Sequence, residues 1–282
     1  MSLPAVTLQR LLEQSVACVT DSDGCRIVWQ KWSARTDTGM PPLVLLHGGF
    51  GSWAHWVHNI SSLRQRRTVF TLDLPGLGDS GDMTAPATTE HFAQLVSSGL
   101  DSLLGTHSPF SLAGFSFGAM IAANLAADVG SRCSRLTLIG AAGCGQLHVQ
   151  VPLLAPPSSH CPSAEAEAIQ RENLGRLMLY DPGSIDDLAV YIHASNLARH
   201  RFNSRKLSRS DDLWTALPKV AAPVVGVWGS QDATAGGGEA LVEREALFRT
   251  HQPACDFHVI ENVGHWAMYE APEQINRILD NH

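Results

Sequence analysis

The 282-residue sequence has no surplus of positive charge and no long apolar run. Its formal net charge is -7, whereas proteins that bind nucleic acid usually carry a basic surplus on one face, so we expect no nucleic-acid partner. No apolar run approaches the roughly 18 residues that a membrane helix needs, and the N-terminus shows no basic stretch followed by an apolar signal core. The sequence therefore predicts a cytoplasmic protein without a membrane partner.

The cysteines form no Cys-x-x-Cys pair, so neither a zinc cage nor a dithiol redox centre is indicated. They are scattered along the chain as Cys18, Cys25, Cys133, Cys144, Cys161 and Cys255. His55 and His58 stand three residues apart, but no acidic or cysteine ligand lies near them, and we expect no metal site. The run 236–238 lacks the Lys-Ser/Thr pair of a phosphate-binding loop. We therefore expect the cysteines to be buried or to have no chemical role, and we expect the protein to work without a cofactor.

Apolar residues make up 44% of the chain and charged residues 17%, which is typical of a soluble globular protein. Short apolar runs alternate with helical patterns, as expected for a parallel sheet whose two faces are covered by helices. The predicted strands are 43–46, 68–72, 110–113, 136–139, 223–228 and 256–260. A helix over about 238–250 and another from about 271 complete a fold of the α/β class.

The alternation of strands and helices stops after Gly145 and resumes only at Pro223. The intervening stretch opens with VPLLAPPSSHCPSAEAEAIQ and continues through charge-rich, helix-like sequence. We therefore predict a core formed by residues 1–144 and 219–282, interrupted by a helical cap over residues 145–218. No internal repeat or low-complexity tract is visible.

Ser116 stands in the run Gly114-Phe115-Ser116-Phe117-Gly118, between a predicted strand and the helix-like run AMIAANLAA. A G-x-S-x-G pattern in this context is typical of a nucleophile elbow, a sharp strand-to-helix turn that exposes the serine hydroxyl. Glycines are needed there because side chains at either flank would collide with the neighbouring strand and helix. The alternative interpretation is a glycine-rich loop whose serine only caps the helix. We favour the nucleophile and expect the two phenylalanines to wall its pocket.

A serine nucleophile needs a base within hydrogen-bond reach and a carboxylate that orients this base. Among thirteen histidines, His265 is the best candidate for the base, because it lies in a loop between a predicted strand and a helix. Asp232 follows the end of another predicted strand and is the candidate acid. An acid at the end of the preceding strand would be expected near residues 140–143, where the sequence has none.

The order of Ser116, Asp232 and His265, each in a loop beyond a strand, resembles the α/β-hydrolase superfamily over nearly the whole chain. The resemblance implies a mostly parallel central sheet flanked by helices, with an inserted helical cap. It also implies a catalytic triad in which these three residues are nucleophile, orienting acid and base.

The run HGGFG at residues 47–51 follows a predicted strand, where members of this superfamily place the loop that offers a backbone N–H to the oxyanion. The resemblance implies that Gly49 is the first candidate for this donor and Phe50 the second. The other donor in the superfamily is the residue after the nucleophile, here Phe117. The same resemblance implies structural roles for His47 and for the loop 73–80.

The cap and the run Gly264-His265-Trp266 resemble the meta-cleavage-product hydrolases, which cleave a carbon-carbon bond in vinylogous 1,5-diketones formed by aromatic ring opening. In that group a tryptophan follows the catalytic histidine, and a cap arginine positions the substrate. The expected position of this arginine falls near 192–193, so Arg199 and Arg201 are the candidates, unless they belong to a solvated face of the cap. The substrate-binding candidates are therefore Phe50, Phe115, Trp266, Arg199 and Arg201.

Together, these patterns predict a cofactor-independent serine hydrolase that acts on a small ester or on a carbon-carbon bond of a ring-cleavage dienoate. Two other functions stay open: a ligand receptor built on a hydrolase fold, and an acyltransferase in which an alcohol replaces water. The expected partner is a small-molecule substrate, and the sequence is compatible with a homo-oligomer.

Overall fold

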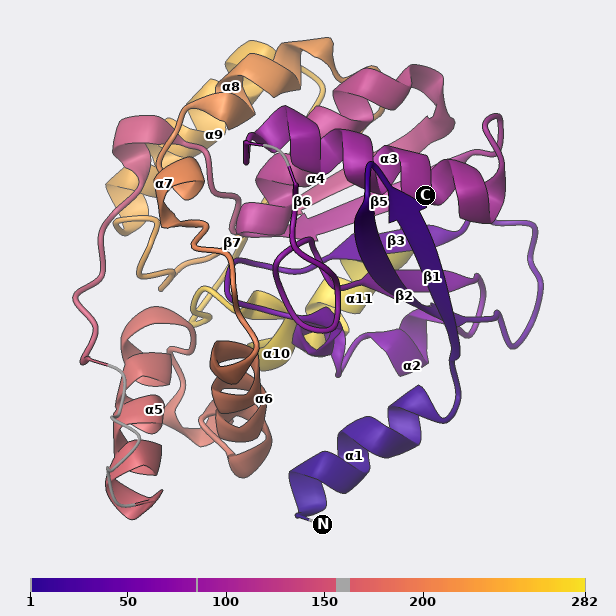
Figure 1. The fold of residues 1–282 in the computed structure, drawn as a ribbon. Helices are drawn as coiled ribbons and strands as arrows, with labels where there is room; N and C mark the ends of the chain where they lie inside the picture. Colours follow the sequence, from indigo (N-terminus) through magenta and orange to yellow (C-terminus); the bar gives the residue numbers. More distant parts are fainter. Residues whose placement is uncertain (1, 85, 156–162, 282) are drawn as a thin grey trace.

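A computed structural model describes residues 2–84, 86–155 and 163–281. In this part of the chain, an eight-stranded sheet runs through the centre of the molecule, with helices on both faces (Figure 1). The order of the strands across the sheet is β1-β2-β4-β3-β5-β6-β7-β8. The strands are β1 (Val16–Ser22), β2 (Cys25–Trp32), β3 (Leu43–Leu46), β4 (Val69–Leu72), β5 (Phe110–Phe115), β6 (Cys133–Ile139), β7 (Val224–Gly229) and β8 (Asp256–Ile260).

The strands from β3 to β8 pair in parallel, as the apolar runs predicted. Strands β1 and β2 pair with antiparallel neighbours and form a hairpin that our sequence analysis did not predict. Its turn contains Asp23 and Gly24, whose φ angles of 52° and 70° lie in the left-handed region that tight hairpin turns require. An Asp-Gly pair between two apolar runs was therefore an available signal.

Helices cover both faces of the sheet, with α3, α4 and α9 on one face and α2 and α11 on the other (Figure 1). Helix α1 precedes the hairpin, and the short α10 leads into α11. The bounds of these helices are α1 (Leu3–Leu12), α2 (Ile60–Leu63), α3 (Thr89–Leu104), α4 (Phe117–Val129), α9 (Gly238–His251), α10 (Ala267–Glu270) and α11 (Pro272–Asp280).

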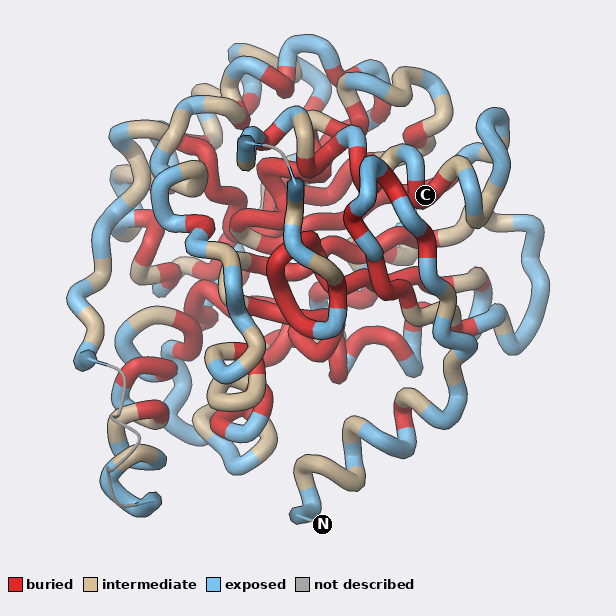
Figure 2. The backbone as a smooth tube through the Cα atoms, viewed as in Figure 1, coloured by how far each residue is buried: buried red, intermediate tan, exposed pale blue. Residues whose placement is uncertain are grey.

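Side chains of the central strands are buried on both faces of the sheet. Val44 and Leu46 join the core under α4, whereas Leu43 and Leu45 join the core under α11. Figure 2 shows buried backbone through the middle of the sheet and exposed residues on the outer sides of the helices. Burial on both faces explains why these strands are continuous apolar runs in the sequence.

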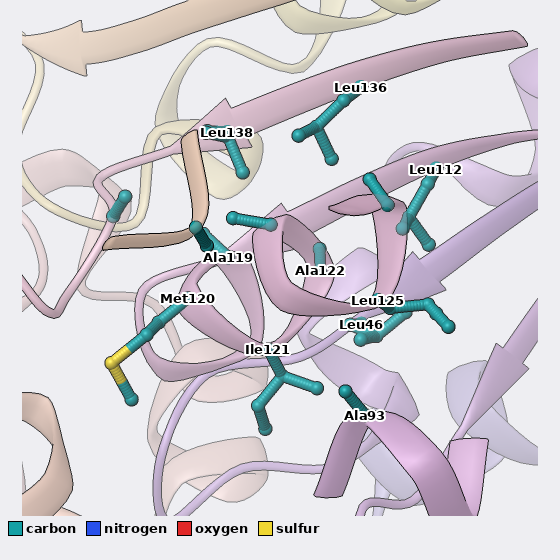
Figure 3. Close-up of a cluster of buried hydrophobic side chains, with 14 of the residues drawn as sticks. Leu46, Ala93, Leu112, Ala119, Met120, Ile121, Ala122, Leu125, Leu136 and Leu138 are labelled. Carbon is teal, nitrogen blue, oxygen red and sulfur yellow. The ribbon is translucent and has the colours of Figure 1, made fainter. Parts of the chain in front are cut away.

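Helix α4 starts directly after Ser116 and is apolar over nearly its whole circumference. Its alanines allow it to lie close to the sheet, and its larger side chains fill the remaining space. Figure 3 shows Ile121 and Leu125 of α4 in the cluster that also contains Leu46 and Ala93. A helix that is apolar on all sides is typical of the interior of a protein.

The region 145–218 is helical where the structure describes it. Helices α5 (Ser163–Leu177) and α6 (Asp187–Ala198) pack on each other, and the short α7 (Arg205–Ser208) and α8 (Asp212–Ala216) pack on α4. Residues 156–162, near the start of the predicted cap, lie outside the described residues. The domain boundaries at 145 and 218 stay a prediction.

Five cysteines lie in the described part of the chain, and all five are free thiols: Cys18, Cys25, Cys133, Cys144 and Cys255. Each of them except Cys18 is buried, and Cys161 lies outside the described residues. In the ranges 2–84, 86–155 and 163–281, no helix combines the length and the apolarity that crossing a bilayer demands.

The position of Leu125 in the core predicts a large loss of stability on truncation. Leu125 is 0% exposed, so Leu125→Ala should lower the free energy of unfolding by about 2 to 5 kcal/mol. Leu3 is 78% exposed, and Leu3→Ala should change it by less than about 0.5 kcal/mol. Urea unfolding of both variants measures this difference, and equal losses would contradict the assignment of the core.

Candidate active site

Ser116 lies in the turn between β5 and α4, with φ and ψ angles of 51° and -115° that residues other than glycine rarely adopt. Its N–H donates to the carbonyl of Ile139 on the neighbouring β6 at 2.9 Å, which holds the turn in place. A Cβ on Gly114 would lie 2.5 Å from the backbone of α4, and a Cβ on Gly118 would lie 2.3 Å from the carbonyl oxygen of His47. The close approach of the chain therefore requires both glycines.

Hydrogen bonds connect Ser116, His265 and Asp232 in a line. Nδ1 of His265 donates to Oδ2 of Asp232 at 2.8 Å, and Nε2 of His265 lies 3.0 Å from Oγ of Ser116. Because the carboxylate engages the proton on Nδ1, Nε2 is left to accept the serine hydroxyl. These residues follow β5, β7 and β8, so the carboxyl ends of three parallel strands bring them together.

Asp232 is 2% exposed, and Thr234 supplies hydrogen bonds to its other carboxylate oxygen. The backbone N–H and the hydroxyl of Thr234 each donate to Oδ1 of Asp232 at 2.8 Å. Burial raises the pKa of Asp232, but the imidazole of His265 and the bonds from Thr234 outweigh this effect and hold the pKa below its usual range. The carboxylate is therefore ionised at neutral pH. Sequence analysis missed Thr234, for which the Asx-turn pattern Asp-x-Thr was the available signal.

Gly140 explains why no acid follows β6. It has a φ of 52°, and a Cβ at this position would lie 3.0 Å from the ring of His265 and 3.3 Å from Oδ2 of Asp232. A side chain there would displace one of these two groups. The residue after β6 therefore has to lack a side chain, because His265 and Asp232, which follows β7, occupy the space next to it.

The loop 47–51 lies against the elbow. A Cβ on Gly48 would lie 3.3 Å from Cβ of Ser116, and a Cβ on Gly49 would lie 3.6 Å from Cβ of Phe117. Within the described part of the chain, the N–H groups of Gly49 and Phe117 donate no hydrogen bond to another group. Two such donors next to a nucleophile can stabilise an oxyanion, and this role stays a prediction.

His47 and Asp73 connect this loop to the loop after β4. Nδ1 of His47 donates to the carbonyl of Gly48 at 2.7 Å, and its Nε2 accepts the N–H of Leu74 at 2.9 Å. Burial lowers the pKa of His47 to about 4. Asp73 accepts the backbone N–H of Trp53, just after the loop 47–51, at 2.9 Å and that of Asp79 at 2.8 Å, and burial raises its pKa to about 6. The two side chains thus fix the position of the candidate oxyanion loop.

His55 lies at the site, although sequence analysis weighed it only as a metal ligand. Its Nδ1 accepts the N–H of Gly48 at 3.3 Å, so the neutral ring carries its proton on Nε2. The ring centroid lies 5.4 Å from that of Phe115 and 5.0 Å from that of Trp266. Burial lowers the pKa of His55 well below its usual range, and it lowers the pKa of His193 on α6 to about 4. Both imidazoles are therefore neutral at physiological pH.

The aromatic residues expected to contact substrate differ in exposure. Phe115 and Trp266 are each 1% exposed, and the ring centroid of Phe115 lies 4.9 Å from that of His265. Phe50 is only partly buried, has a φ of 53°, and packs against His200 with 4.9 Å between ring centroids. Phe115 therefore packs against the ring of the candidate base and Trp266 against that of His55, both within the core, while Phe50 lies nearer the surface. Contact of these three residues with substrate stays a prediction.

Arg199 and Arg201, the cap arginines considered for substrate binding, both lie in ion pairs. Nη1 of Arg199 lies 3.1 Å from Oδ1 of Asp79, and Nε of Arg201 lies 2.7 Å from Oδ1 of Asp82. The arginine side chains are 37% and 41% exposed. These pairings agree with the alternative of a solvated cap face, and a role of either guanidinium group in substrate binding stays a prediction. They form a solvated link between the cap region and the core.

Glu270 joins the histidine loop to the cap region, a role for which the sequence pattern carried no signal. Its carboxylate accepts the N–H of Gly264 at 2.6 Å and two N–H groups of the segment 178–181 at 2.8 and 2.7 Å. The N–H of Trp266 donates to a carbonyl of the same segment at 2.7 Å. Burial raises the pKa of Glu270, against the effect of these hydrogen bonds. The position of the candidate base thus depends on the cap region.

The model of the alpha/beta hydrolase family matches residues 43–278, and the chain belongs to this family. The match extends from β3 to α11 and includes the elbow, the acid loop and the histidine loop. The superfamily resemblance and the fold class inferred from the sequence are thereby confirmed.

Two curated relatives illustrate the range of similar proteins. The 2-hydroxy-6-oxononadienedioate/2-hydroxy-6-oxononatrienedioate hydrolase of Burkholderia vietnamiensis is 25% identical over 86% of this chain and 87% of its own length. The dihydrolipoyllysine-residue acetyltransferase component of the acetoin cleaving system of Pseudomonas putida is 27% identical over 88% of this chain. The chain spans 64% of the length of that acetyltransferase component.

Solved structures share the fold at low sequence identity. The meta-cleavage product hydrolase of Pseudomonas fluorescens IP01 has a TM-score of 0.70 and 18% identity, with 93% of this chain and 95% of that chain covered. A carboxylesterase of Bacillus subtilis has a TM-score of 0.71 and 19% identity, with 98% of this chain and 95% of that chain covered. These similarities establish a common architecture.

The buried neutral His47 predicts that stability falls on acidification. Its pKa is about 4 in the folded protein against an ordinary value of 6.5, so the unfolded chain binds more protons between these values. The free energy of unfolding should therefore decrease as the pH falls from about 6.5 to 4, by up to about 3 kcal/mol from His47 alone. Urea unfolding across this range measures the slope. His47→Asn should flatten the slope, and an unchanged slope would contradict the assignment.

Proposed function

We propose that this protein is a cofactor-independent serine hydrolase of small, uncharged carboxylic esters. Ser116 is the nucleophile, His265 the general base and Asp232 the acid that orients the base. The observation that carries this proposal is the continuous line of hydrogen bonds from Asp232 through His265 to Ser116, with separations of 2.8 and 3.0 Å. Membership of the alpha/beta hydrolase family supports it.

In the first half of the reaction, Oγ of Ser116 adds to the ester carbonyl carbon while Nε2 of His265 takes the hydroxyl proton. Asp232 stabilises the imidazolium, and the N–H groups of Gly49 and Phe117 bind the oxyanion. When the carbonyl re-forms, the bond to the alcohol oxygen breaks and His265 gives its proton to this oxygen. Water, deprotonated by the same imidazole, then hydrolyses the acyl-enzyme.

The charges near the site favour an uncharged substrate. Arg199 and Arg201 are paired with carboxylates of the chain. The guanidinium of Arg205 lies over the ring of Phe50, 5.4 Å from its centroid. The imidazoles of His55 and His193 are neutral because burial lowers the pKa of each. A substrate carboxylate would have to break an existing contact of an arginine, whereas a neutral ester needs no cation.

A second candidate is cleavage of a carbon-carbon bond in a ring-cleavage dienoate. It is favoured by the curated relatives named as hydrolases of 2-hydroxy-6-oxononadienedioate and by the tryptophan, Trp266, that follows His265. The same groups would serve a different first step, because the dienol must become a ketone before the bond can break. Paired arginines make this the weaker candidate.

Loss of the nucleophile should abolish ester hydrolysis. Ser116→Ala should lower kcat for p-nitrophenyl acetate or butyrate by at least about 1000-fold, because the attacking group is removed and the remaining groups only bind substrate. Circular dichroism and a thermal melt serve as the control for folding. Near-normal turnover by a folded Ser116→Ala variant would end the serine-hydrolase proposal.

The two candidate substrate classes can be compared directly in one assay series. The unmodified enzyme should hydrolyse p-nitrophenyl esters with a kcat/KM at least about 100-fold above that for a chromogenic ring-cleavage dienoate. Arg199→Ala and Arg201→Ala should change kcat/KM for the ester by less than about threefold. Efficient dienoate turnover, lost selectively in one arginine variant, would replace the ester proposal by the second candidate.

A further inference from the structure

The segment 199–204 follows α6 within the cap region, contacts the candidate oxyanion loop where His200 packs against Phe50, and ends at Ser204. The N–H of Phe202 donates to the carbonyl of Gly76 at 3.1 Å, which anchors the segment to the core. The ring of Phe202 packs near that of Phe117, with 6.0 Å between centroids. The hydrogen bond and the ring contact of Phe202 therefore fix the position of Ser204, which is only 2% exposed.

The hydroxyl of Ser204 lies directly beside Gly49. A Cβ on Gly49 would lie 2.2 Å from Oγ of Ser204 and 3.6 Å from Cβ of Phe117. The Ser204 hydroxyl and Phe117 thus approach the same side of Gly49. Ser204 therefore lies beside the two residues whose backbone N–H groups are the proposed donors to the oxyanion.

The hydroxyl of Ser204 is available as a donor. Within residues 2–84, 86–155 and 163–281, Oγ of Ser204 forms no hydrogen bond with another residue, and the oxygen keeps access to solvent although the residue as a whole is 2% exposed. Its neighbours Arg201 and Arg205 do have partners, on the loop after β4 and on Phe50. A hydroxyl that has no protein partner, and that lies next to the candidate site in a nearly buried residue, is suited to a ligand that arrives during turnover.

We propose that Ser204 is a third hydrogen-bond donor to the oxyanion, delivered by the cap region and acting with the N–H groups of Gly49 and Phe117. This inference rests on the proposed hydrolase function. As Oγ of Ser116 bonds to the carbonyl carbon, the π electron pair moves to the carbonyl oxygen and the hydroxyl proton moves to His265. The Ser204 O–H then donates to the new oxyanion, and it keeps its own proton throughout.

The test combines kinetics with a transition-state mimic. Ser204→Ala should lower kcat for p-nitrophenyl butyrate by about 10- to 100-fold, with KM within about threefold, because the bond strengthens only as charge develops. The affinity for an alkyl trifluoromethyl ketone, whose adduct with Ser116 carries an alkoxide, should fall by a similar factor. Ser208→Ala, which removes a half-buried hydroxyl four residues further along, is the matched control and should leave both quantities unchanged.

The outcomes separate the two proposals. If the unmodified enzyme hydrolyses the ester and Ser116→Ala does not, hydrolysis stands on its own. In that case, an unchanged kcat and ketone affinity in Ser204→Ala overturns the role of Ser204 alone. A rise in KM without a fall in kcat also overturns it, because that result describes ground-state binding. Failure of the unmodified enzyme to hydrolyse the ester overturns the hydrolase proposal and, with it, the role of Ser204.

A second pair of variants tests the contact itself through stability. Gly49→Ala should lower the melting temperature, since its Cβ would lie 2.2 Å from Oγ of Ser204. Adding Ser204→Gly to this variant should restore most of the loss, because the overlapping atom is removed. No restoration in the double variant would show that Ser204 lies elsewhere, and the proposal would fall even if Ser204→Ala could not be purified.

Discussion

The close approach of β5 and α4 at Ser116 is the constraint on which the rest of the structure depends. A left-handed residue other than glycine costs on the order of 1 to 3 kcal/mol, and the chain retains this conformation because the surroundings are well packed. Burial of a single large apolar side chain contributes about 1.5 to 3 kcal/mol, and α4 buries several of them. The packing of one apolar helix therefore outweighs the strain that exposes one hydroxyl.

The cap region touches each of the loops that carry the proposed chemistry. Its entry segment bonds to the acid loop, where the N–H of Val149 donates to the carbonyl of Thr234 at 3.0 Å. Its middle bonds to the histidine loop through Glu270, and its exit segment brings Ser204 beside Gly49. A shift of the cap would therefore move the acid loop, the histidine loop and the candidate oxyanion loop together. The geometry of the candidate triad therefore depends on the position of the cap region.

Much of the fold and the candidate triad could be predicted from the sequence because their signals are local. Apolar runs mark the buried strands, and the glycines around Ser116 mark the elbow. Thr234, Glu270 and His55 were missed because their roles come from contacts that only the folded chain creates. The ion pairs of Arg199 and Arg201 could not be predicted either. Their partners, Asp79 and Asp82, lie in a loop more than 100 residues earlier in the sequence, and only the fold brings this loop next to the arginines. Local patterns thus identify the candidate nucleophile better than they identify the residues that surround it.

The bonds of Glu270 have a consequence for how such enzymes diverge and can be engineered. A cap is often regarded as an exchangeable module that sets substrate preference. Here a carboxylate of the core holds backbone groups of the segment 178–181 and of Gly264 at once. Transplanting a foreign cap would leave this half-buried carboxylate with Gly264 alone, and the histidine loop would lose its connection to the cap. New specificity is therefore more accessible through single side chains on the existing cap than through replacement of the whole insertion.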